Sequence, residues 1–205
     1  MTDTKTAEAV SLAPASAPRL TPRARDAMAL GILLVAFLVP LRGLLRAPGP
    51  PMEEGFMLVF PERVLAGAIP NKDFLHLYGP GSLWVLAAVY KVFGTTLSVE
   101  RLFGLLQQMA IVFGVFALAR RWGRTVAVLC GLIAVVCIVP TGLTALAWVG
   151  AVGLGLLAVV AAAASRDRDD PQRAKRLALV AGMLVGFALL YRKGTQGRPG
   201  GLPHK

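Results

Sequence analysis

The sequence predicts an all-α polytopic membrane protein, with about five transmembrane helices and an interfacial helix in a large first outer loop. Hydrophobic residues make up 56% of the 205 residues and charged residues only 16%, whereas a soluble domain carries roughly 25% charged residues. The mean hydropathy of +0.64 leaves too little polar surface to cover a soluble globule of this size. The apolar residues also form long uncharged runs, which is the pattern of helices that cross a lipid bilayer.

Charge and cysteine counts exclude other classes of protein. The chain has 22 Lys+Arg and 11 Asp+Glu, and a net charge of +11 would suit a protein that binds nucleic acid. We predict no nucleic-acid partner and expect membrane lipid instead, because basic residues beside apolar runs set the orientation of a membrane protein. Cys130 and Cys137 lie seven residues apart in an apolar run, so we expect free buried thiols and neither a disulfide scaffold nor a multi-cysteine zinc site.

The first 26 residues are rich in Ala, Ser, Thr and Pro, and their three prolines oppose a continuous helix. We interpret residues 1–26 as a disordered cytoplasmic tail. It is not a signal peptide, because the apolar run begins late and no small-residue cleavage site follows it. A membrane domain over residues 27–191 follows, and its first span is predicted from Ala27 to Leu45.

The rest of the membrane domain contains one polar segment and a second half that is almost entirely apolar. Residues 46–100 hold several prolines and acidic residues and are interpreted as one large outer loop. After this loop, uncharged runs predict four further spans, at 102–119, 124–139, 142–164 and 177–191. Pro140, Thr141 and Gly142 supply the turn between the two middle spans.

One segment decides the topology, and the sequence leaves two arrangements open. Gly81–Phe93 is apolar but reaches only about 20 Å as a helix, short of a bilayer core of roughly 30 Å. If it crosses, the arginines of 120–124 and the basic residues of 165–176 face outward. If it lies along the interface, both loops face the cytoplasm with the N-terminal arginines. The positive-inside rule favours the second arrangement, which has five spans in the cell membrane and a cytoplasmic N-terminus.

The C-terminal residues 192–205 form a basic, glycine-containing tail without periodicity. The five-span topology places this tail outside, where a basic segment is unusual. Two interpretations remain: the chain is a truncated front part of a longer membrane protein, or it is a complete small protein with a short basic terminus.

The outer loop carries the candidate functional residues. Glu53 and Glu54 follow the first span, and adjacent carboxylates there suit a general base or a divalent-cation ligand. The alternative is a solvated acidic turn that opens a helix. Asp73, His76 and Tyr78 form a second polar group, whose alternative role is anchoring at the interface. Ligand spacing gives no definite metal site and no cofactor.

The order of these pieces resembles the N-terminal part of the GT-C membrane glycosyltransferases, in the branch of the protein O-mannosyltransferases and aminoarabinose transferases. After an apolar span come Met52-Glu53-Glu54-Gly55, a Gly67-x-x-Pro70-x-x-Asp73-Phe74 segment, Tyr78-Gly79-Pro80 and an apolar interfacial helix. The loop at 119–124 is similar to the family's arginine-rich loop between spans. The resemblance covers roughly residues 27–165, and its specific part is residues 53–81.

The resemblance implies inverting sugar transfer in the cell envelope, from a polyprenyl-phosphate-linked sugar at the outer membrane face. Glu53 or Glu54 would match the family's first-loop acid, and Asp73 and Tyr78 would shape the outer cavity. The other candidate substrate-binding residues are His76, Arg63 and Lys72. Arginine and lysine could meet the donor phosphate, although snorkelling anchors are the alternative for both.

Departures from the family pattern keep a second function class open. Tyr78-Gly79 stands where the aminoarabinose branch has a Glu-Lys pair, and Pro140–Leu146 lacks the acid of a later outer loop. Family members also have about twice as many spans, so the resemblance leaves open that these residues are inactive alone. The alternative function is a non-catalytic integral membrane protein, a fragment or a scaffold. A transporter is disfavoured, because no span as predicted carries a charge in the middle of the membrane.

Overall fold

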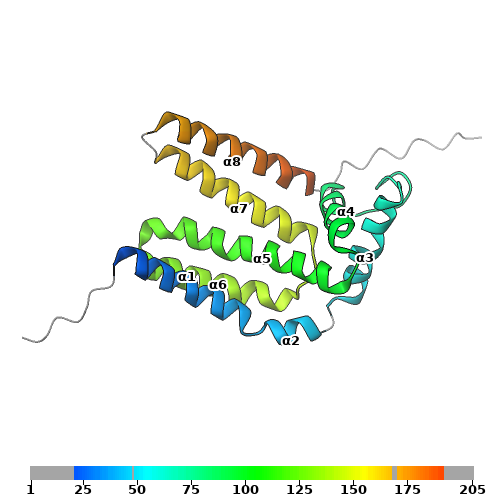
Figure 1. Cartoon of the computed structure of the whole chain (residues 1–205), viewed down its shortest axis with the longest axis horizontal. Helices are drawn as coiled ribbons and strands as arrows, with labels where there is room; N and C mark the ends of the chain where they lie inside the picture. The colour runs from blue at the N-terminus through cyan, green and yellow to red at the C-terminus, as the bar shows by residue number, and fades with distance from the viewer. Residues whose placement is uncertain (1–20, 48, 168–169, 192–205) are drawn as a thin grey trace, which may run out of the picture.

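The computed structural model describes residues 21–47, 49–167 and 170–191 and consists of helices (Figure 1). Most of the two predicted tails, residues 1–20 and 192–205, lies outside this described part. Within it no strand forms, which confirms the all-α prediction. The helices are α1 Pro22–Leu38, α2 Leu41–Arg46, α3 Pro51–Leu65, α4 Gly81–Phe93, α5 Leu97–Ala119, α6 Arg124–Ile138, α7 Ala147–Arg166 and α8 Pro171–Tyr191, with 3-10 turns at Arg120–Trp122 and Val139–Thr141.

Five helical segments of the described chain are long and apolar enough to cross a membrane, which agrees with the five predicted spans. They are Pro22–Arg46, Leu97–Trp122, Arg124–Thr141, Ala147–Arg166 and Pro171–Tyr191. Each has at least 18 residues, or about 27 Å of helix, close to the thickness of a bilayer core. The protein is therefore a multi-pass membrane protein by the length and composition of its helices.

Several predicted boundaries are wrong, and helix capping explains two of them. The tail was expected to extend to residue 26, but α1 begins at Pro22. Proline is favoured in the first helical turn because it has no N–H to leave unsatisfied, and the Thr21 hydroxyl accepts a hydrogen bond from the Ala24 N–H at 3.3 Å. The span predicted at 102–119 begins at Leu97, because Thr96 caps it by accepting the Val99 N–H at 3.3 Å.

The last two spans also differ from their predicted limits. α7 begins at Ala147 rather than at 142, because residues 142–146 form a non-helical segment that packs against α5. α8 begins at Pro171 rather than at 177, so its first turns carry basic side chains. Charges at a helix end do not stop a membrane helix, since long basic side chains extend toward water.

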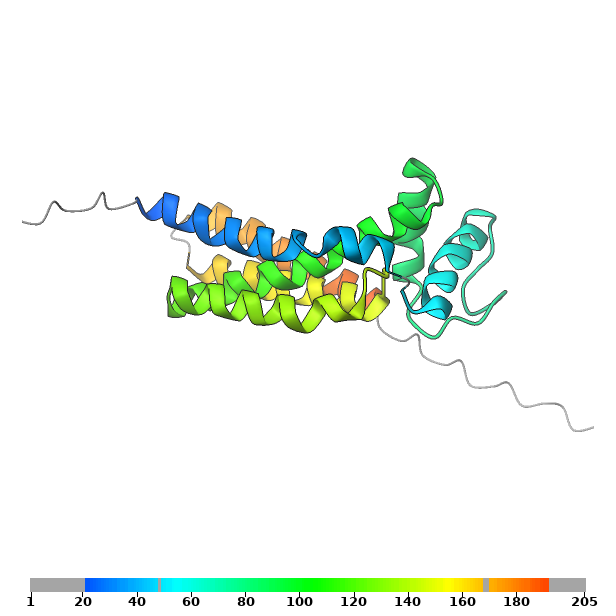
Figure 2. The ribbon, with the colours of Figure 1, turned by 90° about the horizontal axis from the view of Figure 1, so that it is seen from below.

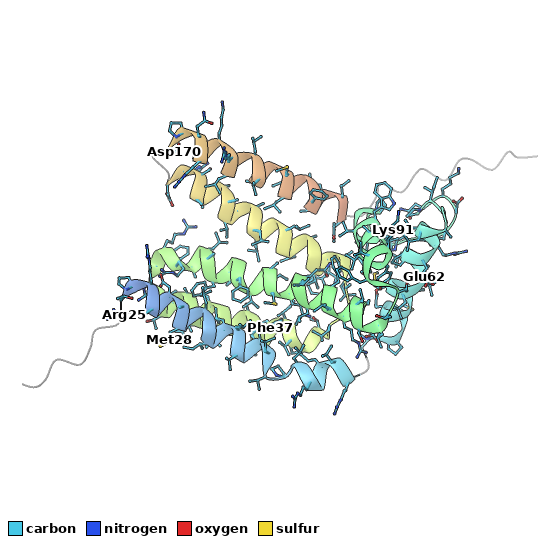
Figure 3. All side chains as sticks on the ribbon, in the orientation of Figure 1. Arg25, Met28, Phe37, Glu62, Lys91 and Asp170 are labelled. Carbon is cyan, nitrogen blue, oxygen red and sulfur yellow. The ribbon has the colours of Figure 1, made fainter. Side chains whose placement is uncertain are left out.

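Successive spans run in opposite directions, so the bundle has two chemically different ends (Figures 1 and 2). We call one the basic end; it consists of residues 22–26, 120–124, 166–167 and 170–176. We call the other the cap end; it consists of α3, α4 and residues 66–80 and 142–146. In Figure 3, Arg25 and Asp170 lie at the basic end, and Glu62 and Lys91 lie at the cap end.

The helix whose crossing was in question, α4, lies beside α3 at the cap end (Figures 1 and 2). Its 13 residues are apolar but shorter than a membrane span. The Tyr90 hydroxyl donates a hydrogen bond to the Met57 carbonyl at 3.1 Å, which joins α4 to α3. Burial raises the pKa of Tyr90, so this hydroxyl stays a neutral donor. Residues 120–124, 166–167 and 170–176 lie at the same end of the bundle as the start of α1 (Figure 1).

α5 is the central helix, and glycines let its neighbours approach closely. Half of the α5 span is buried, more than in any other described span. A Cβ on Gly114 would lie 2.9 Å from the Leu156 Cβ of α7, and one on Gly104 would overlap the Leu143 carbonyl. Small residues at such contacts are the usual means of packing helices in a membrane, where dispersion replaces the hydrophobic effect.

α6 shows why one cysteine prediction fails. Its buried face is formed by Ala127, Gly131, Val135 and Ile138, which pack toward the other helices. Cys130 is half-buried and packs against the core cluster that includes Phe116 and Ala127, whereas Cys137 is exposed. Both thiols are free within the described chain, as expected, but Cys137 is not buried against protein.

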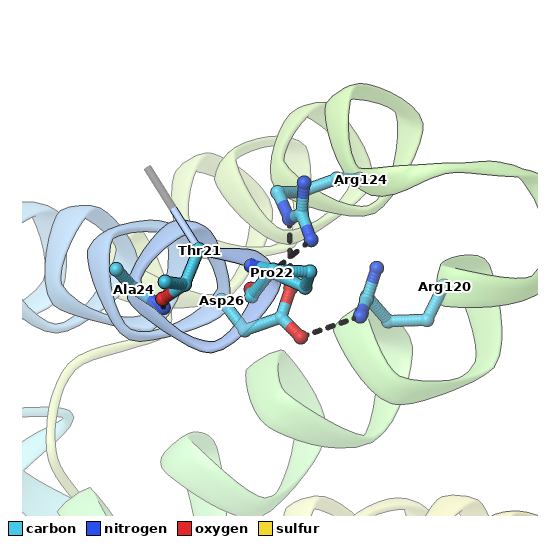
Figure 4. Close-up of polar contacts among 6 residues, drawn as sticks. All are labelled: Thr21, Pro22, Ala24, Asp26, Arg120 and Arg124. Atoms are coloured by element: carbon cyan, nitrogen blue, oxygen red, sulfur yellow. Dashed lines mark hydrogen bonds and ion pairs between the residues drawn. The ribbon is translucent and has the colours of Figure 1, made fainter. Parts of the chain in front are cut away.

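A single carboxylate joins three elements at the basic end. Asp26 of α1 accepts a hydrogen bond from Arg120 at 2.8 Å and another from Arg124 at 2.7 Å (Figure 4). Arg120 and Arg124 begin the 3-10 turn and α6, so the contact fixes α1 against the α5–α6 connection. Because these side chains are about one-third exposed, the pairs add specificity more than stability.

The contact of Gly104 predicts a large difference between two glycine substitutions. We expect Gly104→Ala to lower the free energy of unfolding by about 1–3 kcal/mol, because the new methyl group must push apart α5 and the backbone at Leu143. Gly155→Ala is the control, because no atom lies within 4 Å of a Cβ there, and higher helix propensity should keep it neutral or stabilising. Thermal unfolding in detergent micelles, followed by circular dichroism, measures both; equal melting temperatures would contradict this packing.

Candidate functional site

The first turn of α3 presents two adjacent carboxylates to different surroundings. Pro51 begins the helix, and Glu53 and Glu54 follow at its amino end, where the helix dipole favours negative charge. Consecutive helical residues point about 100° apart, since a turn takes 3.6 residues. This separation lets the two acids take different partners, Arg101 for Glu54 and the lining of a cavity for Glu53.

Glu54 forms an almost buried ion pair with Arg101 of α5. The Arg101 Nε donates to the Glu54 Oε1 at 2.7 Å, and the two side chains are only 7% and 13% exposed. A second Arg101 nitrogen donates to the Leu45 carbonyl at the end of α2. Arg101 therefore joins α2, α3 and α5, and Glu54 is occupied by a structural contact.

Glu100, the residue before Arg101, holds another segment. It is fully buried, and its Oε1 accepts a hydrogen bond from the Ala145 N–H at 2.7 Å. This contact fixes the non-helical residues before α7. Sequence reasoning missed Glu100 and Arg101, because the span was placed to begin at Leu102 and so to exclude charge. Thr96, a strong N-cap residue, was the signal that the helix starts earlier.

Glu53 lines a cavity of about 170 Å³ between α3 and the segment before α4. We call it the aromatic cavity. Its lining residues are Glu53, Phe56, Met57, Phe60, Leu75, His76, Leu77 and Tyr78. It is smaller than the pockets of drug-sized ligands, which span roughly 300–1,000 Å³, so it suits one small group such as a single ring. Three polar side chains among apolar walls can orient such a group.

His76 is the most enclosed polar group of the aromatic cavity. It is 6% exposed, its ring contacts Phe60 and Tyr78 edge-on with centroids 5.8 Å apart in each case, and its Nε2 has no hydrogen-bond partner among the described residues. Burial lowers the pKa of His76, because the charged imidazolium is poorly solvated there. The ring is therefore neutral at pH 7, with Nε2 ready to bond a ligand.

A tight turn places His76 and uses one predicted site residue for that purpose. The Asp73 carboxylate accepts the Ile69 N–H at 2.8 Å, and the Asn71 side-chain oxygen accepts the His76 N–H at 3.0 Å. Asn71 has a φ of 64°, a left-handed conformation that asparagine adopts more readily than most residues. The resemblance implied that Asp73 shapes the outer cavity; the Asp73 side chain holds the loop and does not line the aromatic cavity.

The two predicted cations lie outside the cavity. Lys72 is exposed on the turn. The Arg63 guanidinium stacks over the Phe74 ring at 5.5 Å from its centroid, and Phe74 packs on the cavity residue Phe60 at 4.9 Å. Three of the predicted site residues line the aromatic cavity together: Glu53, His76 and Tyr78. The other four do not line it: Glu54, Arg63, Lys72 and Asp73.

Tyr78 also lines a second, apolar hollow that faces the membrane region. This groove has a volume of about 480 Å³ and runs over α7 and α8, past Trp148, Val152, Gly155, Val185 and Leu189. Tyr78 lines both hollows, and from Tyr78 the groove extends along α7 and α8. An elongated apolar chain in the groove would carry its head group to Tyr78.

The two glutamines of α5 differ in their contacts. The Gln108 side-chain nitrogen donates to the Gly142 carbonyl and, at 3.3 Å, to the Thr141 hydroxyl. Gln108 therefore joins α5 to the turn that follows α6. Gln107 is buried without a hydrogen-bond partner among the described residues, and it packs where Gly150 leaves room beside Tyr191.

The cation expected near the first-loop acids lacks a ligand set. Among the described residues, no three His, Cys, Asp or Glu side chains group together as a metal site needs. Glu54 is bound to Arg101, which leaves Glu53 as a single carboxylate in the cavity.

Comparisons of the chain with protein-family models, with curated proteins and with solved structures give no match.

The buried ion pair predicts a large cost for removing one partner. We expect Arg101→Met to lower the free energy of unfolding by about 3–5 kcal/mol, because Glu54 and the Leu45 carbonyl would lose their buried donor. Arg173→Met is the control: Arg173 pairs with Asp170 at 3.4 Å on the surface, so its loss should cost less than about 1 kcal/mol. Denaturation in mixed micelles compares them, and similar costs would refute the buried clamp.

The lowered pKa of His76 predicts a loss of stability in acid. The unfolded chain binds a proton at His76 near pH 6.5 and the folded chain only at lower pH, so acid favours unfolding between these two values. Above pH 6.5 both states are neutral and the effect vanishes. We expect the stability of the wild type, relative to His76→Phe, to fall as pH drops below about 6.5.

Melting temperatures of both proteins at a series of pH values measure this difference. His204 is present in both, so its titration cancels. A constant difference between pH 7.5 and pH 5 would show that His76 is not buried as described.

Proposed function

We propose that the chain forms part of a membrane glycosyltransferase that takes its sugar from a polyprenyl-phosphate donor. The observation that carries the proposal is the meeting of Glu53, His76 and Tyr78 in one aromatic cavity at the end of an apolar helical bundle. Aromatic walls suit the apolar face of a sugar ring, and a few convergent polar groups suit its hydroxyls. The resemblance of residues 53–81 to GT-C enzymes points to the same chemistry.

The proposed membrane orientation follows from charge. The basic end carries the arginines and lysines of α1, α8 and two connections, whereas the outer loop with the end of the first span, residues 42–100, balances five Lys/Arg against five Asp/Glu. Positively charged connections remain in the cytoplasm, so the cap end and its cavity would face outward. A lipid-linked sugar at the outer face would then reach the cavity without crossing the bilayer.

The two hollows that share Tyr78 suit the two parts of such a donor. The groove over α7 and α8 is apolar and would hold the prenyl chain, and the smaller aromatic cavity would hold the sugar. The phosphate between them would lie near Tyr78. Among the described residues, no arginine or lysine lines the cavity. The proposed cationic contact for the phosphate is therefore Arg63, which stacks on Phe74, the ring that packs against the cavity residue Phe60.

Glu53 is the proposed general base. Its carboxylate would take the proton of the acceptor hydroxyl while the acceptor oxygen bonds to the anomeric carbon. The bond from that carbon to the donor phosphate breaks on the opposite side, and the phosphate leaves with the electron pair, which inverts the anomeric configuration. The neutral His76 Nε2 would orient a sugar hydroxyl. Glu54 would act only as a positioning residue, through Arg101.

We expect Glu53→Gln to abolish donor consumption, by roughly the 10²–10⁴-fold typical of a lost general base, without loss of thermal stability. Glu62→Gln is the matched control, since Glu62 is an exposed carboxylate of the same helix. Membranes carrying each variant are supplied with a radiolabelled polyprenyl-phosphate hexose, and sugar transfer and donor-dependent thermal shifts are measured.

The two readouts separate the alternatives. A thermal shift without sugar transfer would leave donor binding intact and make the described residues one part of a larger catalytic site. Equal transfer by Glu53→Gln and the wild type would remove Glu53 from the mechanism. If the wild type shows neither transfer nor a shift with the donor, the proposal fails, and a non-catalytic membrane protein is the better interpretation.

A further inference from the structure

At the basic end, away from the proposed sugar site, α5 and α7 separate. The two helices touch at glycines: a Cβ on Gly114 would lie 2.9 Å from the Leu156 Cβ, and one on Gly153 would lie 3.1 Å from the Ala110 Cβ. Beyond these contacts α5 and α7 diverge toward the basic end (Figure 1). Hollows of about 360 and 180 Å³ occupy the space that opens between them.

We call these hollows together the α5–α7 cleft. Arg121 and Asp167 line both of them, and Arg166 lines the larger. The remaining walls are apolar, from Leu118 on α5 and from Val159 and the small residue Ala163 on α7. The cleft therefore has charged groups at its mouth and an apolar interior toward the centre of the bundle.

Some arginines at the basic end have an acidic partner. Arg120 and Arg124 share Asp26, which offsets one of their two charges (Figure 4), and Arg173 pairs with Asp170. For Arg121 and Arg166 the described part of the chain provides no ion pair within 4.0 Å. Asp167 lies at the same mouth and offsets one of the two charges, so the cleft keeps a net positive charge.

Arg121 is also positioned at the depth of a membrane surface. Its guanidinium lies 4.5 Å from the centroid of the Trp122 ring, and Trp122 is 65% exposed. Exposed tryptophan beside arginine at the end of a span is typical of the headgroup region of a bilayer. Stacking on the ring leaves the edge of the guanidinium, with its N–H groups, directed at other partners.

We propose that the α5–α7 cleft binds an anionic phospholipid, with its headgroup phosphate on Arg121 and Arg166 and one acyl chain against the apolar wall of α7 around Val159 and Ala163. Arginine matches phosphate oxygens with two parallel hydrogen bonds, and basic pockets between membrane helices hold anionic headgroups. The apolar wall gives a phospholipid contacts that a free phosphate ion cannot make. This site is independent of the glycosyltransferase proposal, because no residue is shared between them.

The test compares full-length protein in neutral detergent with added phosphatidylglycerol, phosphatidylcholine or inorganic phosphate. Native mass spectrometry counts retained lipids and thermal unfolding gives apparent affinities. We expect phosphatidylglycerol to bind at least about tenfold more tightly than phosphatidylcholine, a difference of about 1.4 kcal/mol.

The variant Arg121→Gln/Arg166→Gln should lose this preference. The control Lys175→Gln/Arg176→Gln removes the same two charges from exposed positions of the basic end outside the cleft, and should keep it.

A further variant tests the apolar wall and guards against misfolding of the first. Ala163→Phe fills the cleft while both arginines remain, so it should lower phosphatidylglycerol binding to the level of phosphatidylcholine. Equal losses in the control variant would overturn the proposal in favour of diffuse attraction to basic residues. Equal retention of both lipids by the wild type, stabilisation by inorganic phosphate alone, or unchanged binding in Ala163→Phe would also overturn it.

Discussion

Two adjacent charged residues at the start of α5 hold the cap end of this protein together. Glu100 accepts the Ala145 N–H, and Arg101 binds both the Glu54 carboxylate and the Leu45 carbonyl. Charges that leave water at the end of a membrane span are tolerated only when they are paired and hydrogen-bonded. Once formed, these contacts connect the residues before α7, helix α3 and the end of α2 to the central helix. The position of Glu53 follows from them, because Glu53 and Glu54 belong to the same helical turn.

The same contacts explain why neighbouring carboxylates differ in chemistry. Arg101 fixes the rotation of α3 about its axis by binding Glu54, and Glu53, about 100° away, is directed to the aromatic cavity. As the proposed general base, Glu53 would have to be held within a fraction of an ångström, and the buried ion pair on the next residue would do this without entering the cavity. The cap end thus combines an occupied acid, which gives rigidity, with a free acid, which is available for chemistry.

Hydropathy and charge predicted the fold class and the number of spans, because the cost of exposing backbone and charge to lipid acts on every residue in a window. The same reasoning misplaced the start of α5, since a window that avoids charge excludes Glu100 and Arg101, whose partners lie 45 and 47 residues away in the chain. The formation of the aromatic cavity also depends on contacts that the sequence pattern does not reveal. His76 and Tyr78 were recognised as polar residues near an interface, but their approach to Glu53 requires the left-handed turn at Asn71 and the packing of Phe60 on Phe74.

The two ends of the bundle use charge in opposite ways, and this follows from how each meets its surroundings. At the cap end, Glu54 and Arg101 are withdrawn from water and paired with each other, and the buried Glu100 holds the Ala145 N–H with one of its oxygens, so charged residues there determine structure. At the basic end, Arg120 and Arg124 pair with Asp26, while Arg121 and Arg166 lie at the mouth of a cleft. In the proposed function, the cap end needs rigidly held side chains for chemistry, and the basic end needs exposed positive charge that attracts lipid headgroups. Of the net charge of +11, the basic end contributes +6 and residues 192–205 contribute +4, whereas residues 42–100 are balanced.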